Sequence, residues 1–257
     1  MNTAPSAPPA AAFPKYFVDL APFRAAFDTG VPILMYHKLG DPPRRAVYKG
    51  TYVGPKLFLQ QLSQFRAAGF QSVSFGDPMP ANDNPGLRFI LTFDDGFASV
   101  FTRGLPLLEQ FQFKAIQFLV PKCIGGRNEW DMPRGEVAEK LMDSAQIREW
   151  IAAGHAIGAH TLTHPSLTEI PEAQAREEIV SSKKMLEDQF GVPIEHFCYP
   201  YGSHNRRIRK MVEEAGYLTA CSVTPGLNSA ATDRFQLLRI CARYRSRELR
   251  NLWGLLS

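Results

Sequence analysis

Short runs of apolar residues alternate with longer helix-like segments along most of the chain. The apolar runs are rich in Val, Ile, Leu and Phe, a composition that favours buried strands. We expect strands at residues 31–36, 70–75, 87–93, 115–120, 156–160, 194–199, 217–223 and 235–242. Strands that alternate with helices in this way are typical of a parallel sheet with helical crossovers.

The helix-like segments fall between these runs. Helices are expected at residues 55–68, in a stretch that ends near 111, and at 144–153, 171–190 and 205–215. The fourth segment is the clearest, because Ile179, Leu186 and Phe190 recur at helical spacing. Gly191 then follows as a stop signal. The alternation favours an α/β fold, a complete or incomplete (β/α) barrel, over a doubly wound open sheet, since no G-x-G-x-x-G follows any strand.

The length of the chain, 257 residues, suits one barrel in a single domain. No internal repeat and no linker rich in Gly, Ser or Pro divides the chain after residue 30. Residues 1–30 are therefore expected to be a flexible N-terminal tail and lead-in, and residues 31–257 the functional domain. Residues 1–14 contain no Lys or Arg and no apolar core, so they lack the pattern of a cleaved export signal.

Composition and charge narrow the choice of partners. The chain is 45% hydrophobic and 21% charged, and its net charge of +4 is too small to indicate a nucleic-acid partner. No apolar stretch approaches the roughly 20 residues that span a bilayer. The four cysteines form no C-x-x-C pair, which argues against a zinc knuckle and an obvious disulfide framework. A cytoplasmic setting is expected, with peripheral membrane association and the oligomeric state left open.

Polar side chains gather at the ends of four expected strands. They are His37, the pair Asp94 and Asp95, the pair His160 and His164, and the loop 199–202 with the sequence Tyr-Pro-Tyr-Gly. In a barrel the carboxyl ends of parallel strands share one mouth, so we expect these groups to converge there.

The acids and the paired histidines suggest a metal centre. Asp94 and Asp95 stand side by side, and two adjacent carboxylates repel each other unless a cation compensates. Asp-Asp-Gly is also an ordinary turn sequence. His160 and His164 are four residues apart, so one turn of helix or a tight loop can aim both at one ion, although a lone histidine is more often a hydrogen-bonded loop residue. Two His with one carboxylate suit zinc, iron, cobalt or nickel.

The remaining groups carry weaker signals. In the Tyr-Pro-Tyr-Gly loop, Pro200 fixes one backbone angle and Gly202 permits another. The amide of Tyr201 can then be held toward the cleft to stabilise an oxyanion, or the loop is an ordinary turn. His37 alone would be structural, but its place at the expected mouth makes it a candidate general acid. Trp130 is a candidate stacking wall for a sugar ring, or it packs against the barrel rim.

Taken together, these residues resemble the polysaccharide deacetylases of carbohydrate esterase family four, which share the nodulation-type deacetylase homology domain. Residues 92–96, Thr-Phe-Asp-Asp-Gly, are similar to the family's first motif and residues 160–165 to its second, and residues 199–202 lie where its third is expected. The resemblance runs from about Val31 to Ala242. It implies a distorted (β/α) barrel of about seven parallel strands, with residues 31–257 as the catalytic domain.

The resemblance also implies roles for single residues. Asp94 would be the catalytic base. The implied ligands of a divalent metal are Asp95, His160 and His164, with zinc expected first and cobalt, nickel or iron as alternatives.

Two positions depart from the family pattern. Cys198 replaces the Arg that usually opens the third motif and orients the base, and the usual C-terminal Leu-x-His is missing, since no His follows His204. A histidine on the N-terminal strand together with Tyr-Pro-Tyr-Gly is instead similar to the branch that deacetylates poly-β-1,6-N-acetylglucosamine. In that branch the acid comes from this strand, which would make His37 the acid. Arg239 would then replace the missing Arg as the partner of Asp94.

The resemblance predicts an N-deacetylase acting on an amino sugar or an amino-sugar polymer. In the implied reaction Asp94 removes a proton from water, the Tyr201 amide holds the oxyanion, and His37 protonates the departing amine as acetate is released. The expected partner is a carbohydrate bearing N-acetyl groups. One alternative is an amidase or deformylase acting on a lipid-linked sugar or small amide, for which the basic cluster 206–210 could meet a phosphate. Another is a non-catalytic carbohydrate-binding relative.

Overall fold

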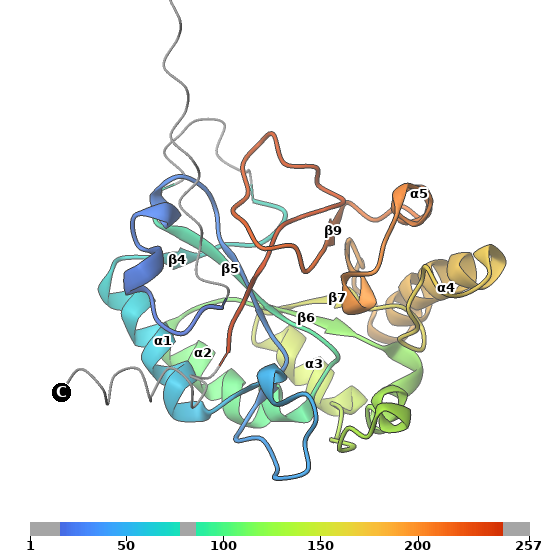
Figure 1. Ribbon diagram of the computed structural model, residues 1–257, viewed down its shortest axis with the longest axis horizontal. Helices are drawn as coiled ribbons and strands as arrows, with labels where there is room; N and C mark the ends of the chain where they lie inside the picture. The colour runs from blue at the N-terminus through green and yellow to red at the C-terminus, as the bar shows by residue number, and fades with distance from the viewer. Residues whose placement is uncertain (1–15, 78–85, 244–257) are drawn as a thin grey trace, which may run out of the picture.

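Seven parallel strands form one curled sheet in this computed structural model, which describes residues 16–77 and 86–243 (Figure 1). Their order is β10-β1-β5-β6-β7-β8-β9. The strands are β1 (Ile33–Tyr36), β5 (Arg88–Phe93), β6 (Ile116–Leu119), β7 (Ala156–Ala159), β8 (His196–Cys198), β9 (Thr219–Cys221) and β10 (Ile240–Cys241). A short strand, β4 (Gln71–Ser72), adds to β5 outside this path. The predicted distorted (β/α) barrel is confirmed.

Helices follow the strands and cover the sheet (Figure 1). They are α1 (Pro55–Ala67), α2 (Leu105–Phe111), α3 (Ser144–Ala152), α4 (Glu172–Phe190) and α5 (Arg206–Glu214). Their ends carry the expected signals. Asp143 and Gln146 form a capping box on α3, and Gly191 closes α4 in the left-handed conformation. A π-helical turn, η4 (Val100–Gly104), precedes α2. Short 3-10 turns are η1 (Ala21–Phe23), η2 (Ala26–Asp28), η3 (Lys49–Thr51), η5 (Pro121–Cys123), η6 (Glu129–Arg134) and η7 (Pro200–Gly202).

Alternate residues of the strands serve two separate apolar clusters. Leu34 and Leu91 belong to the larger cluster, which includes the apolar faces of the helices. Their neighbours Ile33 and Ile90 belong to a smaller cluster that also contains side chains of β6, β8 and β9. Successive side chains of a strand point to opposite faces, so this division marks the helix-covered face and the inside of the barrel. The barrel interior is thus packed, and the site must lie at a mouth.

The last expected strand is shorter than predicted. Over residues 235–242 only β10 is regular, and Leu237 makes an isolated bridge to Cys221 of β9. Ile240 pairs with Leu34 of β1, so this segment connects the two edges of the curled sheet. The backbone between them is bonded outside the ladder, because the N–H of Arg239 donates to Thr224 at 2.9 Å.

The N-terminal region packs against the barrel over the part that the structure describes. Of the expected tail and lead-in, residues 1–15 lie outside the described residues. Phe17 and Phe27 are buried, and the ring centroids of Phe17 and Phe65 of α1 lie 5.5 Å apart. The N–H of Phe17 also donates to Cys241 at 2.8 Å. Phe17 and Phe27 therefore belong to the core, because burying their aromatic rings outweighs the cost of ordering this segment.

Two short strands were not anticipated. β2 (Lys38–Leu39) and β3 (Tyr52–Val53) form a separate parallel pair directly after β1. Two residues are too few to produce a readable alternation. Within the described residues, no helix is long and apolar enough to cross a membrane.

Candidate active site

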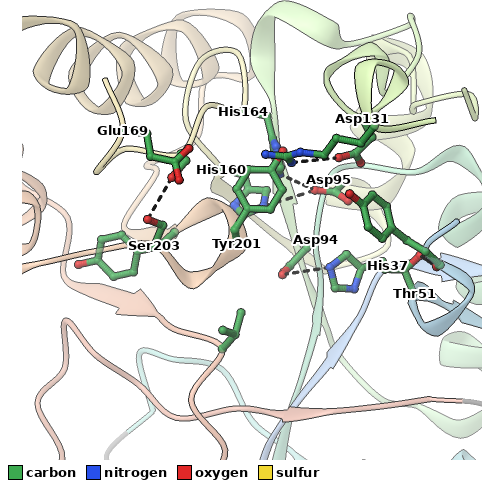
Figure 2. A pocket seen from close by; sticks show the side chains of 15 residues that line it. His37, Thr51, Asp94, Asp95, Asp131, His160, His164, Glu169, Tyr201 and Ser203 are labelled. Carbon is green, nitrogen blue, oxygen red and sulfur yellow. Dashed lines mark hydrogen bonds and ion pairs between the residues drawn. The ribbon is translucent and has the colours of Figure 1, made fainter. Parts of the chain in front are cut away.

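The expected groups converge at the carboxyl ends of the strands. A cavity of about 470 Å³ opens there (Figure 2). Its lining includes His37 after β1, Asp94 and Asp95 after β5, His160 and His164 after β7, and Tyr201 after β8. Of the five non-glycine residues with positive φ in the described chain, Asp95, His164 and Tyr201 line this cavity, and Thr161 follows the lining residue His160. Left-handed backbone at such residues is costly and concentrates at functional sites.

Three buried side chains form a candidate metal centre. Oδ1 of Asp95 lies 3.4 Å from Nε2 of His160 and 3.2 Å from Nε2 of His164. One donor atom from each residue falls within 4.8 Å of the other two. Two imidazoles and one carboxylate are a donor set that divalent transition metals accept, with room for further ligands. The residues therefore fit a divalent cation.

The two histidines are held in different ways. His160 donates from Nδ1 to the carbonyl of Cys198 at 2.7 Å, which leaves Nε2 to face Asp95. The ring of His164 stacks on Trp130, with centroids 4.5 Å apart, and meets Tyr201 edge-on at 4.8 Å. Trp130 therefore packs on a candidate ligand, and it is outside the cavity lining, as is the buried Pro200.

Charge at this centre favours an ionised carboxylate. Burial acts to raise the pKa of Asp95, but hydrogen bonds from His160 and His164 outweigh it and hold that pKa well below its usual value. Burial acts to lower the pKa of His160, but Cys198 and Asp95 raise it well above its ordinary range. For His164 burial dominates and lowers the pKa.

A second donor group overlaps the first but suits a cation less well. Asp94, His160 and Cys198 also offer donor atoms within 4.8 Å of one another. Burial raises the pKa of the Cys198 thiol to about 11, so the sulfur keeps its proton. A protonated thiol is a poor ligand, because metals bind the thiolate. The guanidinium of Arg239 also lies 3.0 Å from this sulfur.

Asp94 forms a bidentate ion pair with a fully buried arginine, Arg239. Arg239 Nη1 donates to Oδ1 and Nη2 donates to Oδ2, each at 2.8 Å. The remaining N–H groups of Arg239 donate to the carbonyl of Ser222, the hydroxyl of Thr92 and the sulfur of Cys198. All five donors of the guanidinium are thus satisfied although the side chain is 0% exposed. Such bidentate pairs set both the charge and the orientation of a carboxylate.

His37 completes the group around Asp94. Its Nε2 lies 3.9 Å from Oδ2 of Asp94, and its side chain is partly exposed to the cavity. Burial acts to raise the pKa of Asp94, but Arg239 and then His37 lower it below its usual value. Figure 2 shows His37 facing Asp94 from one side of the cavity, with Tyr201 and His164 above.

The cavity walls contain residues that the sequence did not indicate. They are Tyr48, Thr51, Asp131, Arg134, Ser166, Glu169, Ser203 and Val223, whereas Tyr199 belongs to the expected loop 199–202. Most of them lie in irregular loops or 3-10 turns, where no periodic pattern marks a position. Arg134 lies over the ring of Tyr201 at 4.6 Å and 3.7 Å from Asp131. Burial, reinforced by the charge of Asp95, raises the pKa of Asp131.

The basic cluster 206–210 faces acidic neighbours. Arg207 pairs with Glu172 at 3.0 Å, and Arg209 pairs with Asp233 at 2.7 Å. These groups lie outside the cavity lining.

Comparison with known proteins identifies the family of this chain. The family model for polysaccharide deacetylase matches residues 81–220. The chain belongs to the polysaccharide deacetylase family. YxkH of Bacillus subtilis (strain 168), a protein named for the same family, is 25% identical over 214 residues, which are 82% of this chain and 70% of YxkH.

A second relative is much longer than this chain. The peptidoglycan-N-acetylglucosamine deacetylase PgdA of Listeria monocytogenes is 25% identical over 158 residues, which are 57% of this chain but only 30% of PgdA.

Solved structures share the fold over nearly the whole chain. The deacetylase PplD of Streptococcus pyogenes, solved with acetate, aligns with a TM-score of 0.70 and 24% identity over 89% of this chain and 98% of PplD. IcaB of Ammonifex degensii aligns with a TM-score of 0.71 and 20% identity over 88% of this chain and 96% of IcaB. At these identities the likeness concerns the fold.

Proposed function

We propose that this protein is a metal-dependent N-deacetylase that removes acetyl groups from an amino sugar or an amino-sugar polymer. Membership of the polysaccharide deacetylase family supports the reaction class. The observation that carries the proposal is one cavity that joins the Asp95, His160 and His164 donor set to Asp94 and His37.

Asp95, His160 and His164 would hold the cation. Zinc is expected first, with cobalt, nickel or iron as alternatives, and a cation of this kind polarises a carbonyl and lowers the pKa of water. The carbonyl of Cys198 fixes the ring of His160, and Trp130 and Tyr201 restrict the ring of His164. The protein thus prepares the donor set through neighbours that are themselves packed.

Asp94 is suited to take the proton of the attacking water. The two hydrogen bonds from Arg239 keep the carboxylate of Asp94 ionised and fix its orientation. A base must be both deprotonated and aimed at the proton it removes. His37, whose Nε2 lies 3.9 Å from Oδ2 of Asp94, is suited to protonate the departing amine nitrogen. The amide of Tyr201 is the proposed donor to the oxyanion.

The position of His37 supports poly-β-1,6-N-acetylglucosamine as the substrate, because it is similar to the position of the acid in the branch of the family that deacetylates this polymer. His37, directly after β1, would replace the missing C-terminal histidine, and Arg239, directly before β10, would replace the missing motif arginine. Kinetics of His37→Ala and Arg239→Ala test both assignments, since unchanged turnover in both variants would contradict them.

The alternatives receive less support. A lipid-linked substrate would bring a phosphate, but Arg207 and Arg209 are already paired with Glu172 and Asp233. A non-catalytic relative would not need an intact pair of Asp94 and Arg239 beside a complete metal donor set.

Acetate release tests the proposal. Metal-stripped protein is reconstituted in turn with zinc, cobalt and nickel and supplied with N-acetylglucosamine oligomers, with Asp94→Asn as the control. Metal-dependent release that the control abolishes is the expected result. Metal binding without acetate release would make lipid-linked or small amide substrates the leading candidates.

A further inference from the structure

A buried ion pair beside the cavity has no part in the chemistry proposed above. Nζ of Lys38 lies 3.5 Å from Oε1 of Glu136, and the two side chains are 4% and 0% exposed. Removing two charges from water costs roughly as much free energy as their mutual attraction returns. Such a pair adds little net stability, so its place beside the cavity points to another role.

Aromatic rings fix the position of the lysine. Nζ of Lys38 lies 4.6 Å from the ring centre of Tyr52 and 4.8 Å from that of Phe97. Both contacts are favourable for a cation held above an aromatic face. The hydroxyl of Tyr52 donates in turn to Glu139 at 3.1 Å. The ammonium group is therefore held from three sides, by two rings and one carboxylate.

The ion pair joins three segments that line the cavity. Lys38 directly follows His37 in the chain. Oε2 of Glu136 accepts the backbone N–H of Tyr48 at 2.6 Å, which ties down the loop that carries Tyr48 and Thr51. Glu136 itself stands two residues after Arg134 of η6, another lining residue.

The joined segments form one side of the cavity. Figure 2 shows Thr51, His37 and Asp131 along this side, opposite Glu169 and Ser203. A Cβ added at Gly135 would lie 3.6 Å from the side chain of Val47, so the loop before β3 and the turn after η6 are in contact. A change at the ion pair would therefore reach the wall through Tyr48 and Arg134.

We propose that Lys38 and Glu136 are positioning residues that set the substrate-binding wall of the cavity. The pair fixes Tyr48 and Arg134 relative to His37, and so governs how tightly a sugar chain is held rather than how fast the acetyl group is hydrolysed. The inference rests on the proposed deacetylase function for its substrate, but the wall itself can be tested without any substrate.

The first test measures amide hydrogen exchange in the full chain. The variants are Lys38→Met and Glu136→Gln, and Lys184→Met is the matched control, because Lys184 pairs with Asp188 at an exposed site. We expect faster exchange in residues 45–52 of both test variants, while β1 and β5 stay protected as in the control. Equal protection of residues 45–52 in all proteins would overturn the proposed positioning role of Lys38 and Glu136. Faster exchange spread evenly over the strands would overturn it as well.

The second test separates a positioning role from a structural one. With N-acetylglucosamine oligomers, we expect KM of the test variants to rise about tenfold while kcat stays within about threefold. Partial unfolding alone would lower the amount of active enzyme and leave KM unchanged, and that result would contradict the proposal. The double variant Lys38→Met/Glu136→Leu removes both charges and is expected to recover stability but not KM.

The experiments distinguish a failure of the proposed deacetylase function from a failure of the positioning role. If the wild-type protein released no acetate, the proposed function would be wrong, and hydrogen exchange would still decide whether the ion pair holds the wall. If the wild-type protein were active and KM were unchanged in both test variants, the proposed positioning role of Lys38 and Glu136 would be wrong, and the deacetylase function would stand.

Discussion

Two pairs of histidines lie at opposite ends of the same sheet. His160 and His164 follow β7 and line the large cavity at the carboxyl ends of the strands. His155 and His196 lie at the amino ends of β7 and β8 and line a second cavity of about 270 Å³. All four side chains are buried, and each pair lies beside the ends of strands. Burial and position therefore do not distinguish the two pairs.

The difference lies in the neighbouring charges. No Asp or Glu of the described chain lines the second cavity, which instead contains Lys114. Burial, and then the charge of Lys114, lowers the pKa of His155 to about 4. Burial, and then Lys183, lowers the pKa of His196 to about 4. At the other mouth Asp95 lies against both histidines. A carboxylate, rather than burial, makes an imidazole a candidate ligand here.

The local contacts of the second pair are those of structural residues. Nδ1 of His155 accepts the N–H of Ala115 at 3.2 Å, and its ring stacks on Trp150 with centroids 4.3 Å apart. His196 bonds to the hydroxyl of Thr219 at 3.0 Å. Both rings thus remain neutral members of the core in the physiological range.

The largest expected difference between the two ends is in turnover. Asp94→Asn should lower kcat about a thousandfold, because the amide cannot accept the proton of water. His155→Gln, at the other end, should leave kcat within about twofold, since no reacting group contacts it. Acetate release by both variants measures the difference. A comparable loss in His155→Gln would show that the two mouths are coupled.

The next largest effect concerns stability at the active end. Arg239→Ala should destabilise the protein by about 3–5 kcal/mol, because it leaves the buried carboxylate of Asp94 without its partner. Urea unfolding of the variant and the wild type measures the change. A loss below about 1 kcal/mol would mean that water or another cation reaches Asp94 and replaces the guanidinium.

Much of this geometry could be predicted, because it lies at the ends of regular elements. Asp94 and Asp95 follow a long apolar strand, and His160 and His164 follow another, so the alternation of strands and helices brings them together. Arg239 could be assigned only through a family resemblance, since nothing in its local sequence identifies its partner. Its link to Asp94 depends on how the sheet curls.

The walls of the cavity could not be predicted for a physical reason. Tyr48 and Arg134 lie in segments with no hydrophobic period. We propose that their positions depend on the buried contact between Lys38 and Glu136, two residues that are far apart in the sequence. Phe17 and Phe27 were likewise hidden, because Phe17 makes only an isolated bridge to Ala242 and Phe27 lies in the 3-10 turn η2, and neither presents helical or strand spacing.

The histidines at the amino ends of the strands, His155 and His196, should make the protein less stable at low pH. The pKa of His155 and of His196 is about 4 in the folded protein and about 6.5 when unfolded, so the unfolded chain binds more protons between these values. Stability from the two histidines is complete above about pH 6.5 and falls as the pH drops toward about 4. The expected loss is about 3 kcal/mol for each imidazole, because one pKa unit corresponds to about 1.4 kcal/mol. His155→Gln and His196→Gln should flatten this part of the curve of unfolding free energy against pH. An unchanged slope would mean that these rings are already charged in the folded state.

The smallest expected effect concerns Cys198, whose thiol takes the fifth N–H of Arg239. Cys198→Ala leaves that donor without an acceptor in a buried site, which should cost about 1–2 kcal/mol of stability. Cys198→Ser keeps an acceptor and should cost less, although its shorter side chain lengthens the hydrogen bond. Urea unfolding of the two variants ranks them. Equal losses would show that the volume of the sulfur, and not its hydrogen bond, is what the Arg239 site requires, and the grip on Asp94 would then depend on packing.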